Sequence, residues 1–370
     1  RRFHAQPNAC WDCGPVVRLW DRNRREITTD DPIGETRSLL KAGYIVAIKG
    51  LGGFHLAVDA TNDEAVKRLR KRKHREEKPL AVMVADMGDV KKVALVSELE
   101  ETLLRSIQRP IVLLEKLADT KIAAAVSPRN RNYGVVLPYT PLHYLLLESE
   151  EVFALVMTSG NISEEPIAID NEEAFGRLGD IADYFLNHNR DIYLRSDDSI
   201  MRVVDKQPRQ IRRSRGYVPI PTFLKDPLAP IVACGAEWKN TICVTRDDQA
   251  FLSQHIGDLE NFETLNFFEM TVGHLKRILE IEPKIIAYDL HPDYLSTQYA
   301  LKQTDLLPIG VQHHHAHVVS CMAENGVTDP VIGIALDGTG YGTDGQIWGG
   351  EVMIAETKDF QRWGHFSYLP

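Results

Sequence analysis

The chain has 370 residues, of which 44% are hydrophobic and 26% are charged, and its formal net charge at pH 7 is −9. This composition is typical of globular proteins, and the length predicts two or three domains. The net negative charge disfavours general electrostatic binding to nucleic acid. No apolar run reaches the roughly 18 residues of a membrane-spanning helix. We therefore expect neither a nucleic acid nor a membrane as a partner.

The N-terminal segment, residues 1–20, contains a C-x-x-C pair formed by Cys10 and Cys13. It has neither a start methionine nor the apolar stretch of a signal peptide, so we expect it to lie inside a longer polypeptide. A structural zinc site needs four ligands, of which these two cysteines would supply two. The total of five cysteines is odd, and the other three stand in apolar surroundings. This pattern favours a reducing compartment and hence a cytoplasmic location.

Residues from about 34 to 220 alternate strand-like apolar runs with amphipathic stretches, a pattern that predicts an α/β domain. A capping box of Thr61 and Glu64 is expected to open the first amphipathic helix. The expected strands are Tyr44–Ile48, Ala81–Val84, Ile111–Leu114 and Phe153–Met157. The expected helices are Asn62–Arg72 and Glu172–Leu178. Four prolines between residues 218 and 230 predict a linker after this domain.

A dense basic run ends the helix predicted at Asn62–Arg72 and continues through Lys73, Arg75 and Lys78. Cations at a helix C-terminus can complement the helix dipole. Arginine can also grip phosphate oxygens in a bidentate manner, and lysine can act as a point charge beside them. The run alone therefore leaves two interpretations open, a phosphate site and a solvated basic face.

The strand predicted at Phe153–Met157 is followed by the small polar run T-S-G-N-I-S at residues 158–163. Such a turn can present backbone N–H groups and side-chain donors to an anion, although it also suits an ordinary helix cap. Two shorter clusters, Asp-Asp-Ser at 197–199 and Arg-Arg-Ser-Arg-Gly at 212–216, are weak signals when each is taken alone.

From Ile231 onward the chain contains a weak internal repeat of a strand, a turn and a second strand. The first copy covers residues 231–245 and the second residues 331–354, where the turn at 337–345 is rich in glycine. Two α/β halves that each begin with a hairpin resemble the actin-like ATPase superfamily, whose hairpins face each other across a phosphate site. We expect the second half to be incomplete at Pro370.

The run V-Q-H-H-H-A-H at residues 311–317 opens a predicted helix that ends at Asn325-Gly326. His313 and His317 are four residues apart, so their rings project from one helix face and can share a metal ion. Four histidines among five residues are unusual for core packing, but a structural or surface cluster is the alternative. Two imidazoles would leave positions for a carboxylate and for water or phosphate oxygens.

Asp337 directly follows a predicted buried strand and precedes a run of glycines. Such a loop suits close approach to phosphate or to a metal ion, whereas a flexible hairpin turn is the alternative. We expect Asp337 to complete a metal site with His313 and His317. Two imidazoles and one carboxylate suit zinc or ferrous iron better than magnesium, which prefers oxygen ligands.

Together, the motifs between residues 34 and 220 resemble the YrdC/Sua5 family, through a glycine segment at 50–60, K-x-R-x-x-K-P-L, S-G-N-x-S and R-R-S-R-G. That family has a twisted α/β fold whose positively charged concave face binds ATP and forms acyl-adenylates. The resemblance implies nucleotide and carbamoyl contacts at Lys49, Lys73, Arg75, Lys78, Ser159, Asn161, Ser163, Ser199 and Arg213. The tRNA-modifying members have Pro-Thr where this chain has Lys49-Gly50, a departure that disfavours threonine as the substrate.

The segment at 235–241, the histidine helix and the run D-G-x-G-x-G-x-D-G resemble the Kae1/TsaD family, and the following Trp-Gly-Gly-Glu is closer to its HypF branch. The resemblance implies that the metal ligands are His313, His317 and Asp337, with a further carboxylate from the family's C-terminal part. It also implies a second nucleotide site at Lys239, Asn240, Gly338 and Gly340.

The order of a zinc-finger remnant, a YrdC-like domain and the first part of a Kae1-like domain resembles the HypF family of nickel–iron hydrogenase maturation, with bounds expected at 1–20, 21–225 and 226–370. The resemblance implies an α/β fold and an ATP-dependent carbamoyltransferase. Carbamoyl phosphate would be cleaved by an N-terminal domain outside this chain. The carbamate would react with ATP and Mg²⁺ to give carbamoyl-adenylate. The carbamoyl group would pass to the C-terminal cysteine of the partner HypE, as the precursor of a cyanide ligand.

Two other functions stay open. One is tRNA threonylcarbamoylation, whose enzymes usually carry the two domains on separate chains. The other is a non-catalytic RNA-binding module that would use the basic runs at 67–75 and 209–215. The sequence assigns no catalytic side chain under any of these functions.

Overall fold

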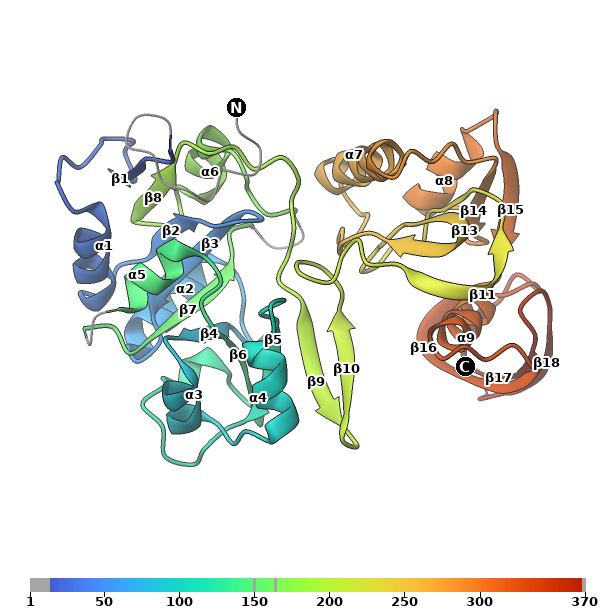
Figure 1. Cartoon of the computed structure of the whole chain (residues 1–370), viewed down its shortest axis with the longest axis horizontal. Coiled ribbons are helices and arrows are strands. Elements are labelled where there is room, and N and C mark those ends of the chain that lie inside the picture. The colour runs from blue at the N-terminus through green and yellow to red at the C-terminus, as the bar shows by residue number, and fades with distance from the viewer. Residues whose placement is uncertain (1–13, 149–150, 163–164, 368–370) are drawn as a thin grey trace. The chain divides into compact units, whose positions relative to one another are not determined.

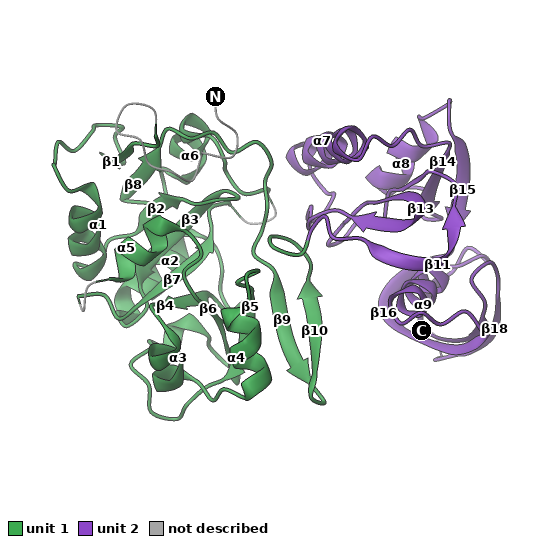
Figure 2. Cartoon of the chain, in the orientation of Figure 1, with its two compact units in different colours: residues 1–217 green, residues 218–370 purple. Residues whose placement is uncertain are grey.

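The computed structural model of the protein describes most of the chain (Figure 1). The described residues are 14–148, 151–162 and 165–367. Three residues with a predicted role lie outside this part of the chain, namely the zinc ligands Cys10 and Cys13 and the nucleotide contact Ser163. The chain divides into two compact units, Arg1–Tyr217 and Val218–Pro370 (Figure 2).

The first unit is built on one ten-stranded sheet whose strand order is β1-β8-β2-β3-β7-β4-β6-β5-β9-β10. The sheet contains both parallel and antiparallel pairs, so it is a mixed sheet in an α/β fold. The strands are β1 (Val17–Asp21), β2 (Val46–Lys49), β3 (Phe54–Asp59), β4 (Ala81–Val84), β5 (Ile111–Glu115), β6 (Asn132–Val136), β7 (Ala154–Ser159), β8 (Tyr184–His188), β9 (Ile200–Val204) and β10 (Gln207–Arg212). The helices are α1 (Pro32–Lys41), α2 (Asp63–Arg72), α3 (Met87–Val93), α4 (Glu98–Arg105), α5 (Pro141–Leu147), α6 (Asn171–Leu178) and the 3₁₀ turn η2 (Ala124–Val126).

Helices cover both faces of this sheet, which explains why its central strands are apolar on both sides. Phe54, Leu56 and Val58 of β3 pack on one face in a core that includes side chains of α2, α3, α4 and α6. Ala57 of the same strand packs on the other face with Leu146 of α5 and with residues of α1. Successive residues alternate between the faces because a strand has a period of two.

The start of α2 differs from the sequence prediction by one residue. Asn62 is the N-cap, and its side-chain oxygen accepts a hydrogen bond of 3.0 Å from the backbone N–H of Ala65. The predicted capping box of Thr61 and Glu64 is therefore wrong. The Thr61 hydroxyl donates instead to Asp59 Oδ1 at 2.6 Å, and asparagine is a better N-cap than threonine.

The second unit contains two sheets. The five-stranded sheet has the order β11-β13-β12-β14-β15, in which β12, β14 and β15 are parallel, and the three-stranded sheet β16-β17-β18 is antiparallel. The strands are β11 (Thr222–Leu228), β12 (Ile231–Ala233), β13 (Cys243–Leu252), β14 (Ile285–Asp289), β15 (Leu307–Val311), β16 (Val331–Tyr341), β17 (Ile347–Ala355) and β18 (Phe360–His365). The helices are α7 (Phe262–Ile278), α8 (Leu295–Leu301) and α9 (His313–Glu324).

The linker predicted at 218–230 does begin at the boundary between the two units, but strand β11 occupies most of it. It pairs with β13 at one edge of the five-stranded sheet. Proline lacks a backbone N–H and is tolerated on edge strands, and Pro227 lies in this strand. The proline-rich composition therefore marks an edge strand that begins just after the boundary between the two units.

Strand β16 continues to Tyr341, well into the segment 337–345 that the sequence predicts as a turn. The turn itself is short, because the N–H of Gly342 already donates to the carbonyl of Gln346 at 2.8 Å. The pairing of β16 with β17 shifts register in this region, and such an irregularity re-aims side chains. Asp337 thus lies inside a strand, at its irregular point.

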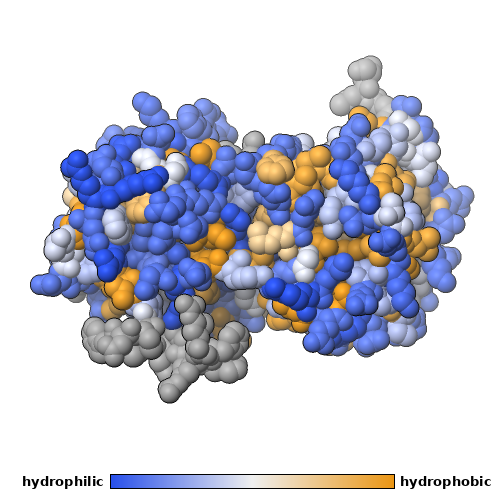
Figure 3. Space-filling model, turned by 90° about the horizontal axis from the view of Figure 1, so that it is seen from above, coloured by the Kyte–Doolittle hydropathy of each residue, from blue (hydrophilic) through white to orange (hydrophobic). Residues whose placement is uncertain are grey.

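None of the helices in the described residues is long and apolar enough to cross a membrane. On the face drawn in Figure 3, hydrophilic residues cover most of the surface of each unit and hydrophobic residues form separate patches. In the second unit, the alternate residues Ile332, Ile334 and Leu336 of β16 are 72%, 66% and 71% exposed. One face of that strand is therefore apolar and solvent-exposed.

Candidate functional sites

The first candidate site brings together Lys73, at the end of α2, and the turn Ser159–Asn161, at the end of β7. Lys73 is 3% exposed. Its Nζ donates to the backbone oxygen and Oδ1 of Asn161 at 2.9 and 2.8 Å, and to the backbone oxygen of Ser159. Burial and the nearby Arg75 cation lower the pKa of Lys73 to about 7. The lysine therefore fixes the turn while carrying a charge that a neighbouring anion would stabilise.

Arg75 is half-buried beside the same turn. Its Nε and Nη2 donate to the carbonyls of Lys78 and Pro79 at 3.2 and 2.6 Å, and its Nη1 lies 3.5 Å from Thr158 Oγ1. Burial and the neighbouring Arg70 cation lower its pKa to about 10. Each terminal guanidinium nitrogen carries two N–H groups, so each has a second N–H group that could donate a hydrogen bond to an anion. Lys78 is exposed on the same loop.

The other predicted nucleotide contacts lie in different surroundings. Lys49 ends β2, is 3% exposed and donates to a backbone carbonyl of β8 at 3.3 Å. Ser199 is fully buried, and its hydroxyl bonds to backbone atoms of residues 214–215 at 2.8 and 3.0 Å. Arg213 is partly exposed just before that segment. The predicted residues that the structure brings together are Lys73, Arg75, Ser159 and Asn161.

A buried polar cluster lies next to this turn in the same sheet. His55 of β3 is the direct register partner of Ser159. Its Nε2 lies 3.4 Å from Asp198 Oδ2 and 3.3 Å from the hydroxyl of Tyr139. Arg215 donates to Asp198 Oδ1 at 2.8 Å, and its guanidinium lies 3.6 Å from the centre of the Tyr139 ring.

Sequence reasoning missed this cluster because its members come from four separate segments. Burial alone would raise the pKa of Asp198, but the hydrogen bond from His55 and the charge of Arg215 outweigh burial and lower it. His143 of α5 packs edge-on against Tyr139 with ring centres 4.5 Å apart. Burial, followed by the charge of His55, lowers the pKa of His143 to about 3. The Asp-Asp-Ser run at 197–199, the Arg-Arg-Ser-Arg-Gly run at 212–216 and the glycine segment at 50–60 each contain one member of the cluster, but no sequence pattern joined them.

The second candidate site lies in the second unit, between α9 and β16. His313 Nε2 is 2.8 Å from Asp337 Oδ2, and His317 Nε2 is 3.2 Å from His313 Nε2 and 3.3 Å from Asp337 Oδ2. Ligand atoms at 2.0–2.1 Å from a tetrahedral zinc ion are roughly 3.3 Å apart. The three atoms thus have nearly the spacing that one ion requires, and no other group of metal-ligating side chains does so in the described residues.

Asp289, the last residue of β14, orients His313. The carboxylate is buried, and its Oδ2 is 2.6 Å from His313 Nδ1. This hydrogen bond raises the pKa of His313 and makes Nδ1 the donor, which leaves Nε2 facing Asp337 and His317. A carboxylate behind a histidine ligand is a common feature of metal sites. We did not predict Asp289, although it directly follows an apolar run of the sequence, as Asp337 does.

The other histidines of α9 face the protein interior. His314 is fully buried, and its Nδ1 lies 3.3 Å from Gln312 Nε2. His315 donates from Nε2 to the backbone oxygen of Glu356 at 2.8 Å and packs against Phe360. Neither residue belongs to the group of atoms with metal-like spacing.

The residues of the predicted second nucleotide site lie in two separate places within the second unit. Gly338 and Gly340 lie in β16, immediately after Asp337, and the N–H of Gly338 donates to Asp337 Oδ1 at 2.6 Å. Asn240 is buried between β12 and β13, where its amide nitrogen donates to two carbonyls of its own turn at 2.9 and 2.6 Å. Lys239 is exposed beside it. No hydrogen bond or ion pair among the described residues joins the two pairs.

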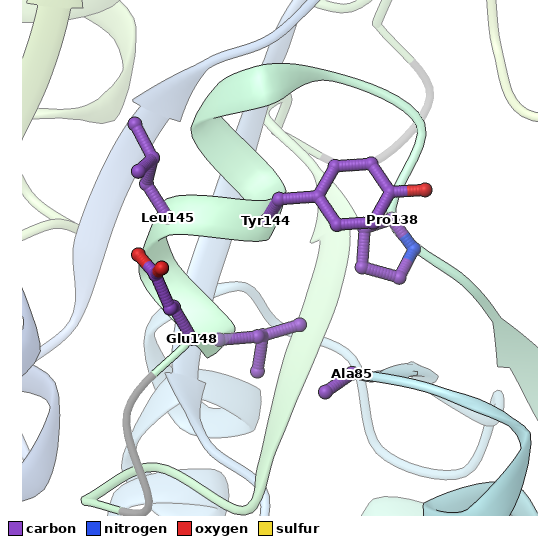
Figure 4. A pocket seen from close by; sticks show the side chains of 6 residues that line it. Ala85, Pro138, Tyr144, Leu145 and Glu148 are labelled. Carbon is purple, nitrogen blue, oxygen red and sulfur yellow. The ribbon is translucent and has the colours of Figure 1, made fainter.

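An open, mostly apolar pocket lies beside α5 in the first unit (Figure 4). Its lining residues are Ala85, Pro138, Tyr144, Leu145, Leu147 and Glu148. None of them is a predicted site residue, so the pocket belongs to neither candidate site.

Four family models match the chain in succession. The HypF finger matches residues 1–20, and a Sua5/YciO/YrdC model described as telomere recombination matches residues 38–214. The HypF Kae1-like domain matches residues 226–324. The second subdomain of the carbamoyltransferase Kae1-like domain matches residues 333–370.

Curated relatives match nearly the whole chain. Carbamoyltransferase HypF2 of Cupriavidus necator is 47% identical over 362 residues, which are 92% of this chain and 45% of that protein. Carbamoyltransferase HypF of Synechocystis is 47% identical over 355 residues, which are 95% of this chain and 46% of that protein. The chain therefore spans about half the length of the curated relatives it matches.

Solved structures give the same result. A full-length HypF in a phosphate- and nucleotide-bound form superposes with a TM-score of 0.91 at 52% identity, covering 98% of this chain and 47% of that one. HypF of T. kodakarensis superposes with a TM-score of 0.94 at 43% identity, covering 100% of this chain and 48% of that one. The expected α/β fold, with a YrdC-like domain followed by Kae1-like parts, is confirmed. From its matched domains, its relatives and its fold, the chain belongs to the HypF family.

Proposed function

We propose that this chain uses ATP to activate a carbamoyl group and passes it toward a thiol acceptor in nickel–iron hydrogenase maturation. The observation that carries the proposal is the pair of cations, buried Lys73 and half-buried Arg75, beside the small polar turn of Ser159 and Asn161 in the YrdC-like unit. The matched relatives are named carbamoyltransferases, and one related structure is described as phosphate- and nucleotide-bound. The substrates proposed for this chain are ATP with Mg²⁺, and carbamate derived from carbamoyl phosphate.

In the proposed first step, a carbamate oxygen attacks the α-phosphorus of ATP, pyrophosphate leaves and carbamoyl-adenylate forms. The charge that develops on the phosphate oxygens would be offset by Lys73 and Arg75. Each charge-assisted contact would stabilise the bound nucleotide by roughly 1.5–3 kcal/mol. The remaining contacts proposed are Lys49, Lys78, Ser163, Ser199 and Arg213. Of these, Ser199 would act by fixing the backbone of residues 214–215.

In the proposed second step, a thiol attacks the carbonyl carbon of the adenylate, AMP leaves and the thiol proton is released. The proposed acceptor is the C-terminal cysteine of HypE. His313, His317 and Asp337 would hold a zinc or ferrous ion, and Asp289 would keep His313 in the ligating tautomer. A bound ion would supply Lewis-acid stabilisation of phosphate charge at this place.

Two further assignments belong to the same proposal. Cys10 and Cys13 would be half of the ligand set of a structural zinc ion, in the segment that the HypF finger model matches. The proposed location is the cytoplasm, because Cys234 and Cys321 are free thiols and free thiols persist in reducing compartments.

The RNA-binding alternative loses support from the way the basic run is used. Arg68 donates to the carbonyl of Gly43, and Arg72 donates to Asp183 at 2.7 Å. These cations are engaged inside the first unit rather than arrayed for a nucleic-acid backbone, which would need free phosphate contacts.

An exchange assay separates the proposed reaction from tRNA threonylcarbamoylation. Radioactive pyrophosphate is incubated with ATP, Mg²⁺ and the 370-residue chain, either with ammonium carbamate or with bicarbonate plus threonine. We expect label to enter ATP with carbamate, without any need for threonine, and the Arg75→Ala variant to lose about ten-fold or more of ATP affinity. Exchange that requires threonine would contradict the proposal and establish the alternative.

A further inference from the structure

Arg70, in the last turn of α2, makes an unusual set of contacts for a buried cation. It is 7% exposed. Its Nη1 lies 3.0, 3.1 and 3.2 Å from the carbonyl oxygens of Arg75, Glu76 and Lys78. Within the described residues, the hydrogen bonds of its guanidinium all go to backbone carbonyls and none to a carboxylate.

The opposite edge of the guanidinium binds a second segment. Nη2 donates to the carbonyl of Val126 at 3.0 Å, and Nε donates to that of Ala125. Both acceptors belong to η2, so Arg70 joins the loop 75–78 to this turn. The amide of Leu80, just after the loop, also donates to the Val126 carbonyl at 3.0 Å.

This arrangement has a physical cost that its hydrogen bonds must offset. Burial lowers the pKa of Arg70 because the charged form loses water. Five carbonyls replace the lost water, and only a planar group with five N–H donors can serve acceptors on two sides at once. A lysine at this position would offer one nitrogen and could not span both segments.

The loop that Arg70 holds carries two cations of the proposed phosphate site. Three carbonyls from four consecutive residues converge on one guanidinium, so the backbone of 75–78 is fixed from the inside. Arg75 continues the same pattern, because its own Nε and Nη2 donate to the carbonyls of Lys78 and Pro79. The side chains of Arg75 and Lys78 are thereby held on a rigid support.

We propose that Arg70 is the positioning residue of the nucleotide site: it fixes the loop 75–78 so that Arg75 and Lys78 meet the ATP phosphates without first being ordered. Ordering a flexible loop at the moment of binding would cost affinity. The inference rests on the proposed function, since phosphate is the proposed ligand of Arg75 and Lys78. Arg70 itself does not touch the nucleotide.

The test uses the variants Arg70→Lys and Arg70→Met in the full chain. Arg72→Met is the matched control, because Arg72 lies on the same helix and its guanidinium bonds to Ile181 and Asp183 instead of the loop. Hydrogen exchange of the amides from residue 74 to residue 80 measures loop order without any nucleotide. Calorimetry with ATP measures affinity, and thermal unfolding measures stability.

We expect both Arg70 variants to exchange faster at residues 74–80 and to bind ATP about ten-fold or more weakly. Arg72→Met should lose thermal stability while its loop exchange and ATP affinity stay near wild type. If Arg70→Met fails to fold, Arg70→Lys keeps the charge and carries the test. Unchanged loop exchange in the Arg70 variants would overturn the inference, as would a loosened loop with unchanged ATP affinity. Failure of the wild-type chain to bind ATP would refute the proposed function, while the exchange data would still decide whether Arg70 orders the loop.

Discussion

Among single residues, Lys73 should make nucleotide binding at the proposed site depend on pH. Its ammonium group donates to three oxygens of the Ser159–Asn161 turn, yet burial lowers its pKa to about 7. Near neutral pH the charged and neutral forms therefore coexist. A bound phosphate would favour the charged form and raise the pKa of Lys73, so binding above pH 7 must take up a proton.

ATP affinity should consequently fall as pH rises from 7.5 to 9. The loss should approach about ten-fold per pH unit, because one pKa unit corresponds to about 1.4 kcal/mol. Calorimetry in buffers with different ionisation enthalpies would measure the affinity and the proton uptake together. A Lys73→Gln variant should bind more weakly but without this pH dependence. If ATP binding by the wild type takes up no proton, and its affinity is the same from pH 7.5 to 9, the role of Lys73 is refuted.

His143 should make the first unit sensitive to acid. Its pKa is about 3 in the folded protein, mainly through burial, against 6.5 for an exposed histidine. As pH falls below 6.5, His143 becomes protonated in the unfolded chain but stays neutral in the folded chain. The free energy of unfolding therefore drops by up to about 1.4 kcal/mol per pH unit until pH 3. Urea unfolding at pH 7.5 and at pH 5 measures the change.

The matched variant for this prediction is His143→Leu, which removes the titrating ring while keeping an apolar side chain of similar size. We expect its stability to fall less than that of wild type between pH 7.5 and pH 5. Equal losses in the two proteins would show that other groups cause the acid sensitivity.

Individual site residues could be predicted where they are neighbours in sequence or follow a strand. Lys73 and Arg75 stand in one basic run, His313 and His317 lie one helical turn apart, and Asp337 directly follows an apolar run of the sequence. His55, Tyr139, Asp198 and Arg215 could not be found in this way, because only the folded sheet brings them together. Their proximity depends on strand order, which a single sequence does not specify.

Among secondary-structure elements, α9 is the one whose regular geometry builds a site. One helical turn separates His313 from His317, and the irregular part of β16 directs Asp337 toward both. We expect His313→Ala with His317→Ala to abolish metal binding. Asp289→Asn should weaken it about 10–100-fold, because the carboxylate that orients His313 is lost. Metal analysis of the purified proteins would check both expectations.

The control for α9 is His314→Ala with His315→Ala. Both rings face the interior, so this pair should unfold at a lower temperature but retain its metal. Loss of metal in this pair together with retention in the first pair would show that the ligands have been assigned to the wrong helix face. Retention in both pairs would mean that the histidine cluster is structural.

Element boundaries were predicted less well than element types, for identifiable reasons. The prolines at 218–230 indicated a linker, and the boundary between the units does lie at its start, but β11 then forms the edge of a sheet, where proline is tolerated. The glycines after Asp337 indicated a turn, but β16 continues to Tyr341, because β17 pairs again with Gly340 and Tyr341 beyond the irregular point. In both cases tertiary pairing overrode the local preference.

For the whole molecule, the sequence predicted the order of the parts because each part carries its own motif. The basic run with S-G-N-x-S indicated the YrdC-like unit, and the histidine helix with its glycine run indicated the Kae1-like parts. Both are confirmed by the matched models. The chemistry linking the two units is still a proposal, because it concerns a reaction and not a fold.

The most direct test of that proposal is the identity of the nucleotide product. The 370-residue chain is incubated with ATP, Mg²⁺ and carbamate labelled with ¹³C and ¹⁵N, and the nucleotides are separated and weighed by mass spectrometry. We predict an adenylate that carries both isotopes, formed together with pyrophosphate and greatly reduced in Arg75→Ala. Formation of ADP and phosphate, or of AMP without either isotope, would contradict carbamoyl activation by this chain.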